Sequence, residues 1–374
     1  MRPPEHGPRI LFFSGGTALR GLSQALVRHT HNSMHIITPF DSGGSSAVLR
    51  KAFAMPAVGD IRNRLVALAD LSVPGIQEIF ALFTYRLSKN DHQGVLVDEL
   101  RRMAGGEHIL IDLVPEPNRS VIRDHFHRFL DIMPEDFDLR GASIGNLVLS
   151  AGYFDHAQRL GPVIDQFSEL AQVRGIVRPV VDENLHLAAE LEDGTVVVGQ
   201  HHMTGKESSP LTSKIKRVWL TDSLDAVEEA ESMIDGQVGN LIRDAELICF
   251  PIGSFYTSVV ANLLPRGVGA AVAANSCPKI FVPNPGIDPE LLGHTVEEQV
   301  ELLRRYLVAS GAPDESNLLH HVVVDSRAEY SGGLNKAAIT RLGVDIIDVP
   351  LVSDESTPLF APDLLANLLV SLVE

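Results

Sequence analysis

Short apolar runs without polar alternation recur along the chain, and such runs are typical of strands that are covered on both faces of a sheet. The first run, residues 10–13, leads into a Ser-Gly-Gly-Thr turn at residues 14–17. Leucines at helical spacing follow through His29 and indicate a helix with one apolar face. This succession of strand, glycine turn and helix predicts the first half of a βαβ unit.

The same succession is repeated at a second run, residues 35–38, which ends near Asp41 and continues through Ser-Gly-Gly-Ser-Ser into another apolar helix. Thr295 and Glu298 form a capping box that predicts the start of a later helix. Alternating strands and helices favour a right-handed, doubly wound α/β fold with a mostly parallel, Rossmann-like sheet. Further buried strands are predicted at residues 246–250, 279–282, 321–324 and 344–349.

Two stretches depart from the parallel pattern. Residues 71–140 carry little strand signal and much helical periodicity, so we expect a helical insertion there, with Ser120 capping one of its helices. Another apolar helix is expected from Ser143. An Asp-Gly turn at residues 193–194 separates two β-rich runs and predicts a β-hairpin ribbon, which we place at about residues 178–220. We therefore expect a single α/β domain over residues 1–374, with one insertion and one ribbon.

Composition and charge narrow the classes of partner. Of the 374 residues 45% are hydrophobic, which is enough to bury a large core. The 48 acidic and 31 basic residues give a formal net charge of −17, which disfavours nucleic acid and anionic membranes as partners. Cys249 and Cys277 belong to neither a C-x-x-C pair nor a metal-ligand spacing, which fits a reducing compartment. With no signal peptide and no apolar run of membrane-spanning length, we expect a soluble, cytoplasmic protein.

Glycine- and serine-rich loops follow several of the predicted strands. In a doubly wound sheet, the loops at the carboxyl ends of the strands gather around a crevice at the topological switch point. Glycines let the backbone approach an anion, helix N-termini direct N–H groups toward it, and hydroxyls add donors. The pattern predicts a phosphate or diphosphate site, with a purely structural turn as the alternative for each loop taken alone. The candidate ligand-binding residues are Gly15, Gly16, Thr17, Gly43, Gly44, Ser45, Ser46, Asp60, Arg62, Asn63, Asn146, Gly253, Ser254 and Asn284.

Charged side chains in these loops have more specific candidate roles. Arg62 is suited to bidentate pairing with a phosphate, whereas a position in solvent is its structural alternative. Asp60 is suited to capping the helix through Ala69. Asp41, at the end of a buried strand, is the carboxylate best placed to hold a divalent cation or to accept a proton. Capping of the following turn is an equally weighted role for Asp41.

Several common site classes are disfavoured. Neither the third glycine of a dinucleotide fingerprint nor the Gly-Lys-Ser/Thr of a P-loop follows the first glycine turn. The 15 histidines include no H-E-x-x-H motif. The adjacent pairs at residues 201–202 and 320–321 are expected to point apart on strands, so no zinc site is predicted. A Ser-His-Asp hydrolase lacks its G-x-S-x-G elbow.

Taken together and in order, these motifs resemble those of the CofD/YvcK superfamily. The resemblance extends over roughly residues 10–290. One branch contains 2-phospho-L-lactate transferases, which move a phospholactyl group from a guanylyl donor to a deazaflavin alcohol with magnesium. The other contains YvcK-like proteins, which bind nucleotide-sugars and influence carbon metabolism and cell-wall synthesis; the Gly-Gly-Ser-Ser and Gly-Asp-Ile-Arg-Asn strings are more similar to this branch. The motifs are residues 14–17, 41–46, 59–63, 65–68, 143–147, 189–196 and 253–258.

This chain departs from the superfamily pattern at three places. Asp41-Ser42 stands where two acidic residues are usual, Ala142 where YvcK-like proteins usually have His, and the glycine run before Thr17 is short. These departures disfavour phospholactyl transfer to a deazaflavin, but they leave backbone phosphate donors in place. The resemblance also implies a homodimer.

Two hypotheses follow for the function. The first is a Mg²⁺-dependent transferase of a phosphorylated group, in which Asp41 holds the metal and Arg62 neutralises charge that develops on phosphate. The second is a non-catalytic protein that binds a nucleotide or nucleotide-sugar and regulates carbon metabolism or cell-wall synthesis.

Overall fold

A computed structural model describes residues 3–205 and 210–373. Its main element is a seven-stranded sheet with the strand order β10-β9-β8-β7-β1-β2-β3, in which all neighbouring strands are parallel. The predicted doubly wound, parallel α/β fold is confirmed. The strands are β1 (Ile10–Ser14), β2 (Met34–Ile37), β3 (Ile176–Pro179), β7 (Leu247–Phe250), β8 (Lys279–Phe281), β9 (His321–Val324) and β10 (Asp345–Asp348).

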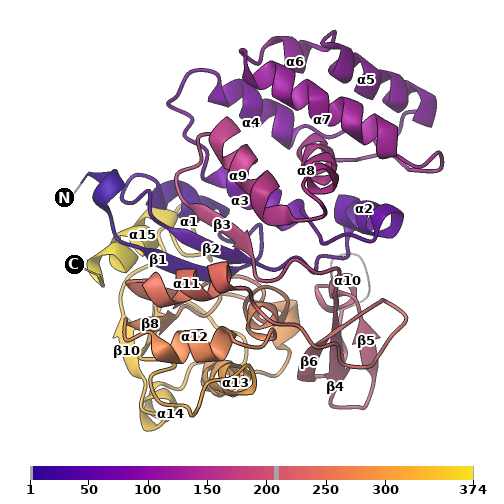
Figure 1. The fold of residues 1–374 in the computed structure, drawn as a ribbon. Helices are drawn as coiled ribbons and strands as arrows, with labels where there is room; N and C mark the ends of the chain where they lie inside the picture. The colour runs from indigo at the N-terminus through magenta and orange to yellow at the C-terminus, as the bar shows by residue number, and fades with distance from the viewer. Residues whose placement is uncertain (1–2, 206–209, 374) are drawn as a thin grey trace.

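The sheet has a topological switch point between β1 and β7. From β1 the chain adds β2 and β3 on one side, whereas β7 is followed by β8, β9 and β10 on the other. Two groups of helices cover opposite faces of the sheet (Figure 1). One group is α1 (Arg20–Leu26), α3 (Gly59–Ala67) and α15 (Pro362–Ser371), and the other is α11 (Gly236–Asp244), α12 (Val268–Ala274), α13 (Val296–Ala309) and α14 (Lys336–Arg341).

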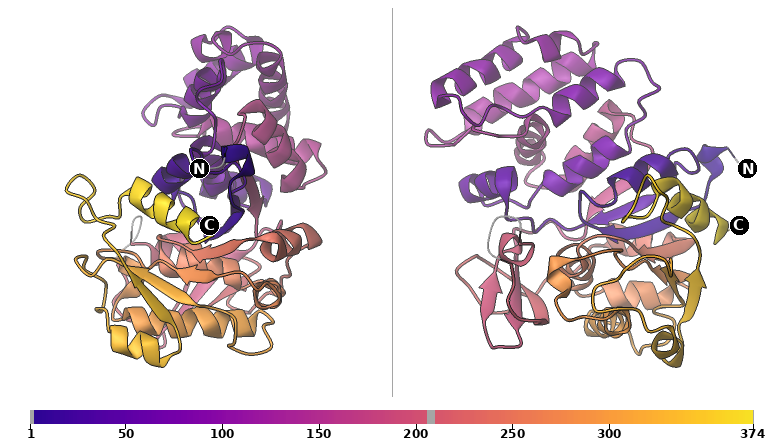
Figure 2. Two further views of the ribbon diagram at one scale, coloured as in Figure 1. Left: turned by 90° about the vertical axis from the view of Figure 1, so that its left-hand side faces the viewer. Right: turned by 180° about the vertical axis from the view of Figure 1, so that it is seen from behind.

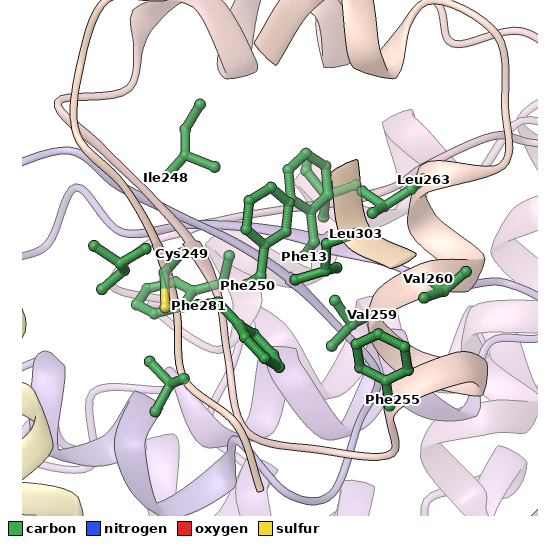
Figure 3. Packing of buried hydrophobic residues seen from close by; sticks show 14 of the residues in the cluster. Phe13, Ile248, Cys249, Phe250, Phe255, Val259, Val260, Leu263, Phe281 and Leu303 are labelled. Atoms are coloured by element: carbon green, nitrogen blue, oxygen red, sulfur yellow. The ribbon is translucent and has the colours of Figure 1, made fainter. Parts of the chain in front are cut away.

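Aromatic side chains from the central strands fill the space between the sheet and one helical layer (Figure 3). Phe13 of β1 stacks on Phe250 of β7 with ring centroids 5.5 Å apart, and both side chains are fully buried. Val259 and Leu303 pack against this cluster from η2 (Phe255–Val259) and α13. Burial on both faces explains why these strands read as unbroken apolar runs. The predicted capping box at the start of α13 is also present.

The strand β3 was not predicted from the sequence. It lies at the edge of the sheet beside β2, and its four residues alternate between exposed and buried positions. It includes Arg178 and Pro179, and proline is tolerated in a strand mainly at an edge. A short edge strand of this composition lacks the apolar run by which the central strands were recognised.

A group of helices between β2 and β3 has a hydrophobic core of its own and stands on the far side of the sheet from α11–α13 (Figure 2). One of these helices begins earlier than predicted: α7 starts at Asn118 after Pro117, so Ser120 lies in its first turn. The Ser120 hydroxyl instead donates to Glu116 Oε2 at 2.8 Å. The helices are α2 (Gly44–Phe53), α3, α4 (Ile76–Thr84), α5 (Gln93–Gly105), α6 (Ile109–Asp112), α7 (Asn118–Ile132), α8 (Ile144–Asp155) and α9 (Leu160–Leu170).

The predicted hairpin forms between β4 (His186–Leu191) and β5 (Val196–Val198), and Gly194 takes a φ of 87° in its turn. A third antiparallel strand, β6 (Ile215–Thr221), pairs with β4. These three strands are called the ribbon below. Directly after β5 the chain forms a short helix, α10 (Gln200–Met203).

That helix overturns the expectation for the pair at residues 201–202. His201 and His202 lie on α10 with ring centroids 3.9 Å apart, so their side chains do not point apart. Gly199, at φ 100°, ends the strand and permits the turn into the helix. Along the described residues, no helix combines the length and the apolar character that crossing a membrane requires.

Candidate functional site

A cavity of about 410 Å³ lies where the loops after β1, β2 and β7 meet, next to the switch point. Of the predicted ligand-binding residues, Gly15, Gly253 and Asn284 do not line it, and all the others do. The lining also includes residues that the sequence did not single out as ligands. The full lining is Gly16, Thr17, Ala18, Asp41, Gly43, Gly44, Ser45, Ser46, Gly59, Asp60, Arg62, Asn63, Arg86, Lys89, Asn146, Gln200, His201, Thr204, Ser254, Thr257 and Ser258.

The first glycine loop is held from behind by α3. The buried Arg64 donates to the carbonyl oxygens of Gly15 at 2.9 Å and Gly16 at 3.3 Å. Because its side chain is removed from water, the pKa of Arg64 falls to about 10, and nearby Asp60 opposes the shift. Gly15 therefore shapes the loop from behind the cavity wall.

Asp60 does not cap a helix. Helix α3 begins at Gly59, two residues earlier than a cap at Asp60 would give, and its N-cap, Val58, makes no side-chain cap bond. Asp60 lies in the first turn and approaches the first loop so closely that a Cβ at Gly16 would lie 2.1 Å from its Oδ1. Only glycine fits at this position without displacing the carboxylate.

The second glycine loop leads into α2 and presents its serines to the cavity. Asp41 Oδ1 accepts the Gly43 N–H at 3.1 Å, so the turn-capping role considered for Asp41 is observed. The other carboxylate oxygen, Oδ2, and Ser46 Oγ both lie close to Gly59: a Cβ there would be 3.6 Å from the first and 2.6 Å from the second. Ser45 Oγ accepts the Ser143 N–H at 3.3 Å.

Arg62 is buried, with 6% of its surface exposed, and lines the cavity. Its Nε donates to Asn146 Oδ1 at 3.2 Å, which fixes the guanidinium against α8. Burial lowers the pKa of Arg62 to about 10; nearby Arg86 and Arg20 lower it further, and Asp60 opposes them. A buried cation close to other cations is electrostatically unfavourable until an anion is bound.

Arg86 and Lys89 complete a cationic wall that the sequence did not predict. Both follow α4 and belong to the stretch interpreted as a helical insertion, remote in sequence from the strand ends. Arg86 is fixed by donating to the carbonyl oxygen of Gly141 at 3.1 Å. Only the packing of α4 and α8 against α3 brings these residues to the cavity.

The loop after β7 differs from the predicted phosphate site, because its helical N–H groups already have acceptors. Phe255 N–H donates to Asp288 Oδ2 at 3.0 Å, and the N–H groups of Tyr256 and Thr257 donate to Glu290 Oε2, each at 2.9 Å. Thr257 Oγ1 and Glu290 Oε1 are 2.5 Å apart. Glu290 lies on η4 (Pro289–Leu291); burial and the neighbouring Asp288 raise its pKa above the ordinary range. This loop therefore presents hydroxyl groups to the cavity.

Asn284, which was predicted to bind a ligand, instead bonds to another residue of the protein. Its Oδ1 accepts the N–H of Gly253 at 3.1 Å, so it braces the third loop from outside the cavity. The sequence placed both residues at a strand end correctly, but only the structure shows that they bond to each other.

Helix α10, which follows the ribbon strand β5, closes the cavity from a further side through Gln200 and His201, together with Thr204 directly after it. His201 Nδ1 lies 2.8 Å from Ser42 Oγ. No sequence pattern indicated these residues as ligands, because α10 follows a strand of the ribbon and not a strand of the parallel sheet from which the strand-end positions were inferred.

For the predicted magnesium ion, the available donors are oxygens. No group of three or more His, Cys, Asp or Glu side chains that could hold a metal occurs among residues 3–205 and 210–373. Asp41 Oδ2 and the Ser46 hydroxyl, which belong to residues lining the same cavity, are hard donors of the kind that accompany phosphate oxygens around Mg²⁺. The residues thus fit a metal that is held largely by the phosphates of a ligand.

The fold and this cavity define an α/β protein with a doubly wound parallel sheet and a polar, glycine- and serine-lined site at the switch point. The family model described as "2-phospho-L-lactate transferase CofD" matches residues 10–352, and the chain belongs to the CofD family.

Similar proteins carry a different name. The "Gluconeogenesis factor" of Bacillus subtilis is 31% identical over 307 residues, which cover 80% of this chain and 75% of that protein. A "Putative gluconeogenesis factor" of Thermotoga maritima is 26% identical over 362 residues, covering 95% and 90%. A crystal structure of a UPF0052 family member from Bacillus halodurans superposes with a TM-score of 0.70 at 23% identity, covering 97% of this chain and 99% of that one. At this level of identity, the similarity to the Bacillus halodurans structure shows the fold alone.

Proposed function

We propose that this protein binds a nucleotide or nucleotide-sugar in the switch-point cavity and acts as a ligand-dependent regulator in carbon metabolism. The observation that carries the proposal is the environment of Arg62: a buried guanidinium, fixed by Asn146, facing the same cavity as Arg86 and Lys89. Phosphate groups would neutralise this repulsion and accept charge-assisted hydrogen bonds.

The loops opposite the cations support a phosphorylated ligand. Gly44, Ser45 and Ser46 form the first turn of α2, whose leading N–H groups have no acceptors within the helix. Such a turn attracts anions. The cavity, at about 410 Å³, falls within the size range of small-molecule sites.

The regulatory role is supported by the relatives named gluconeogenesis factor. Ser42 also supports it, since this position has no second carboxylate to share a metal with Asp41. We propose that bound and free forms differ in how the ribbon and the helices between β2 and β3 meet across the cavity, and that a partner senses this difference.

A magnesium-dependent transferase is the second candidate, favoured by the presence of Asp41 and Ser46 in the cavity lining and by the description of the family model. An acceptor hydroxyl would attack the phosphorus distal to the nucleoside and lose its proton to water, and the nucleoside monophosphate would leave with the bridging oxygen. When bound, Mg²⁺ would stabilise charge on the phosphate oxygens. Arg62 would do the same from the protein side.

Calorimetric titration with ADP, GDP, CDP and UDP and with their hexose conjugates, in magnesium and in chelator, tests the proposal. We expect micromolar binding of at least one conjugate without release of nucleoside monophosphate. Repeated turnover in the presence of an acceptor alcohol would replace the regulatory proposal with the transferase. An absence of binding across the whole panel would refute both.

A further inference from the structure

The start of α8 lies against several of the groups that line the cavity. Helix α8 packs against α2, α3 and α4, and two of these helices carry Ser45 and Arg62. The Arg62 side chain packs on Gly145, where a Cβ would lie 3.0 Å from Arg62 Cγ and 2.7 Å from the carbonyl oxygen of Phe83. Glycine at this position therefore lets α8 approach both α3 and the end of α4 closely.

Asn146, the next residue along α8, joins two of the elements that form the cavity. It is buried, with 1% of its surface exposed. Its Oδ1 accepts the Arg62 Nε–H at 3.2 Å, and its Nδ2 donates to Ser45 Oγ at 3.5 Å. Because an arginine side chain carries only donors, the amide atom that faces Arg62 must be the oxygen. The amide nitrogen of Asn146 is thereby directed toward Ser45.

The hydroxyl group of Ser45 receives two donors from α8. Besides the Asn146 amide, the backbone N–H of Ser143, the N-cap residue of α8, donates to Ser45 Oγ at 3.3 Å. A hydroxyl group has two acceptor positions and one hydrogen. No acceptor for that hydrogen occurs within the described part of the chain, and Ser45 lines the cavity. Ser45 is therefore left as a hydrogen-bond donor to a ligand.

The guanidinium of Arg62 is oriented by the same amide. Its Nε is held by Asn146, and its Nη1 lies 3.5 Å from the carbonyl oxygen of Phe83. Nη2 has no partner among residues 3–205 and 210–373, and Arg62 lines the cavity. An ionised phosphate group carries several acceptor oxygens and can receive hydrogen bonds from two donors at once. Arg62 and Ser45, which contact the same amide, are neighbouring donors of this kind.

We infer that Asn146 is a positioning residue: it directs the Arg62 guanidinium and the Ser45 hydroxyl so that both donate to one phosphate group of the ligand. This inference rests on the proposed function. The sequence indicated Asn146 as a ligand-binding residue, whereas this role acts through two other side chains. Removal of the Asn146 amide should weaken binding although both donors are still present.

The first test needs no ligand. In ¹⁵N NMR spectra of the wild type, the Arg62 Nε–H should give a resonance that is protected from exchange with solvent, assigned by its absence in Arg62→Lys. Asn146→Ala should speed this exchange about tenfold, since one hydrogen bond is lost. Asn146→Asp, which keeps an oxygen for the Arg62 Nε–H, should retain the protection. Equal protection in Asn146→Ala and the wild type would overturn the inference.

The second test measures affinity by calorimetric titration with inorganic pyrophosphate and with the best-binding hexose conjugate of the nucleotide panel. Asn146→Ala should weaken the binding of both probes about tenfold. In the Arg62→Ala background the same substitution should weaken binding about threefold or less, because one of the two donors that Asn146 orients is already absent. If the alanine variant does not fold, Asn146→Ser, which keeps a polar group at the buried position, replaces it in both tests.

Asn240→Ala is the matched control. Asn240 Oδ1 also accepts from an arginine, Arg243, at 2.7 Å, but Asn240 is exposed on α11 and lies outside the cavity lining. This variant should bind both probes like the wild type.

Two results of the titrations would overturn the inference while the proposed function stands. An undiminished tenfold loss in the Arg62→Ala background would mean that Asn146 contacts the ligand directly. Unchanged affinity in Asn146→Ala would mean that Asn146 positions neither donor. If the wild type binds no nucleotide and no conjugate, the proposed function itself fails and the inference with it.

Discussion

Two glycine- and serine-containing loops of the same sheet differ in whether the N–H groups at the start of the following helix already have acceptors within the protein. After β2, the first turn of α2 directs Gly44, Ser45 and Ser46 toward the cavity. After β7, the N–H groups at residues 255–257 bond to the carboxylates of Asp288 and Glu290. The N–H groups of a potential anion-binding loop can thus be occupied by the protein's own acidic side chains. The loop after β2 is therefore an open site, and the loop after β7 is a filled one.

The largest effect should come from removing the Glu290 carboxylate that accepts the hydrogen bonds of the loop after β7. Glu290→Ala would leave the Tyr256 and Thr257 N–H groups and the Thr257 hydroxyl without their acceptor in a buried environment. We expect the free energy of unfolding to fall by about 3 kcal/mol, measured by urea denaturation. Glu301→Ala, exposed on α13, is the control and should change stability little. Wild-type stability in the Glu290 variant would show that the carboxylate does not saturate this loop.

A change in the cavity that faces the open loop should lower ligand affinity and leave the stability of the protein nearly unchanged. Arg62→Ala removes a charge-assisted contact in a partly desolvated cavity, which corresponds to about 1.5–3 kcal/mol of binding. We expect nucleotide affinity to fall by an order of magnitude or more in calorimetric titration, with the apo melting temperature nearly unchanged because repulsion from Arg86 is also relieved. Arg101→Ala, exposed on α5, should bind like the wild type. Equal affinity of the Arg62 variant and the wild type would rule out phosphate contact by Arg62.

A smaller, metal-dependent effect is expected at Asp41. Asp41→Asn keeps an oxygen to accept the Gly43 N–H, so the turn should survive, but a neutral amide is a weaker ligand for Mg²⁺. We expect the variant to lose the magnesium-dependent part of nucleotide binding and to keep binding in chelator. Titrations that coincide for variant and wild type under both conditions would remove the metal role and leave Asp41 as a turn cap.

A further effect should appear in the pH dependence of stability. The pKa of Glu290 is raised from 4.5 to about 8 in the folded protein, chiefly by burial. A raised folded-state pKa means that the folded protein binds the proton more tightly, so this contribution to stability is fully present below the unfolded pKa and is lost as the pH rises through the folded one. Glu290→Gln, which has no proton to lose, should show a flatter decline between about pH 5 and pH 9 in urea denaturation. Parallel curves for variant and wild type would contradict the shift.

Apolar runs were enough to predict the doubly wound parallel sheet, an Asp-Gly turn the hairpin at residues 193–194, and a Thr-Glu pair the capping box of α13. These features are local: a strand buried on both faces, an Asp-Gly turn and a capped helix each leave a pattern within a few residues. The glycine loops were also recognisable, and most of their residues do line one cavity. Their ligand roles remain predictions.

The other features depend on residues far apart in sequence. Arg86, Lys89 and His201 reach the cavity only because helix packing and the ribbon bring them there, and no short pattern encodes that proximity. The saturation of the β7 loop joins residues more than 30 positions apart, Phe255 to Asp288 and Tyr256 to Glu290. Local sequence patterns are therefore sufficient to place the sheet and the loops at its carboxyl edge, because periodicity and turn chemistry act between near neighbours. Which helix N-termini stay open to a ligand and which side chains face it was decided only by the tertiary structure, because burial and hydrogen bonding act through space.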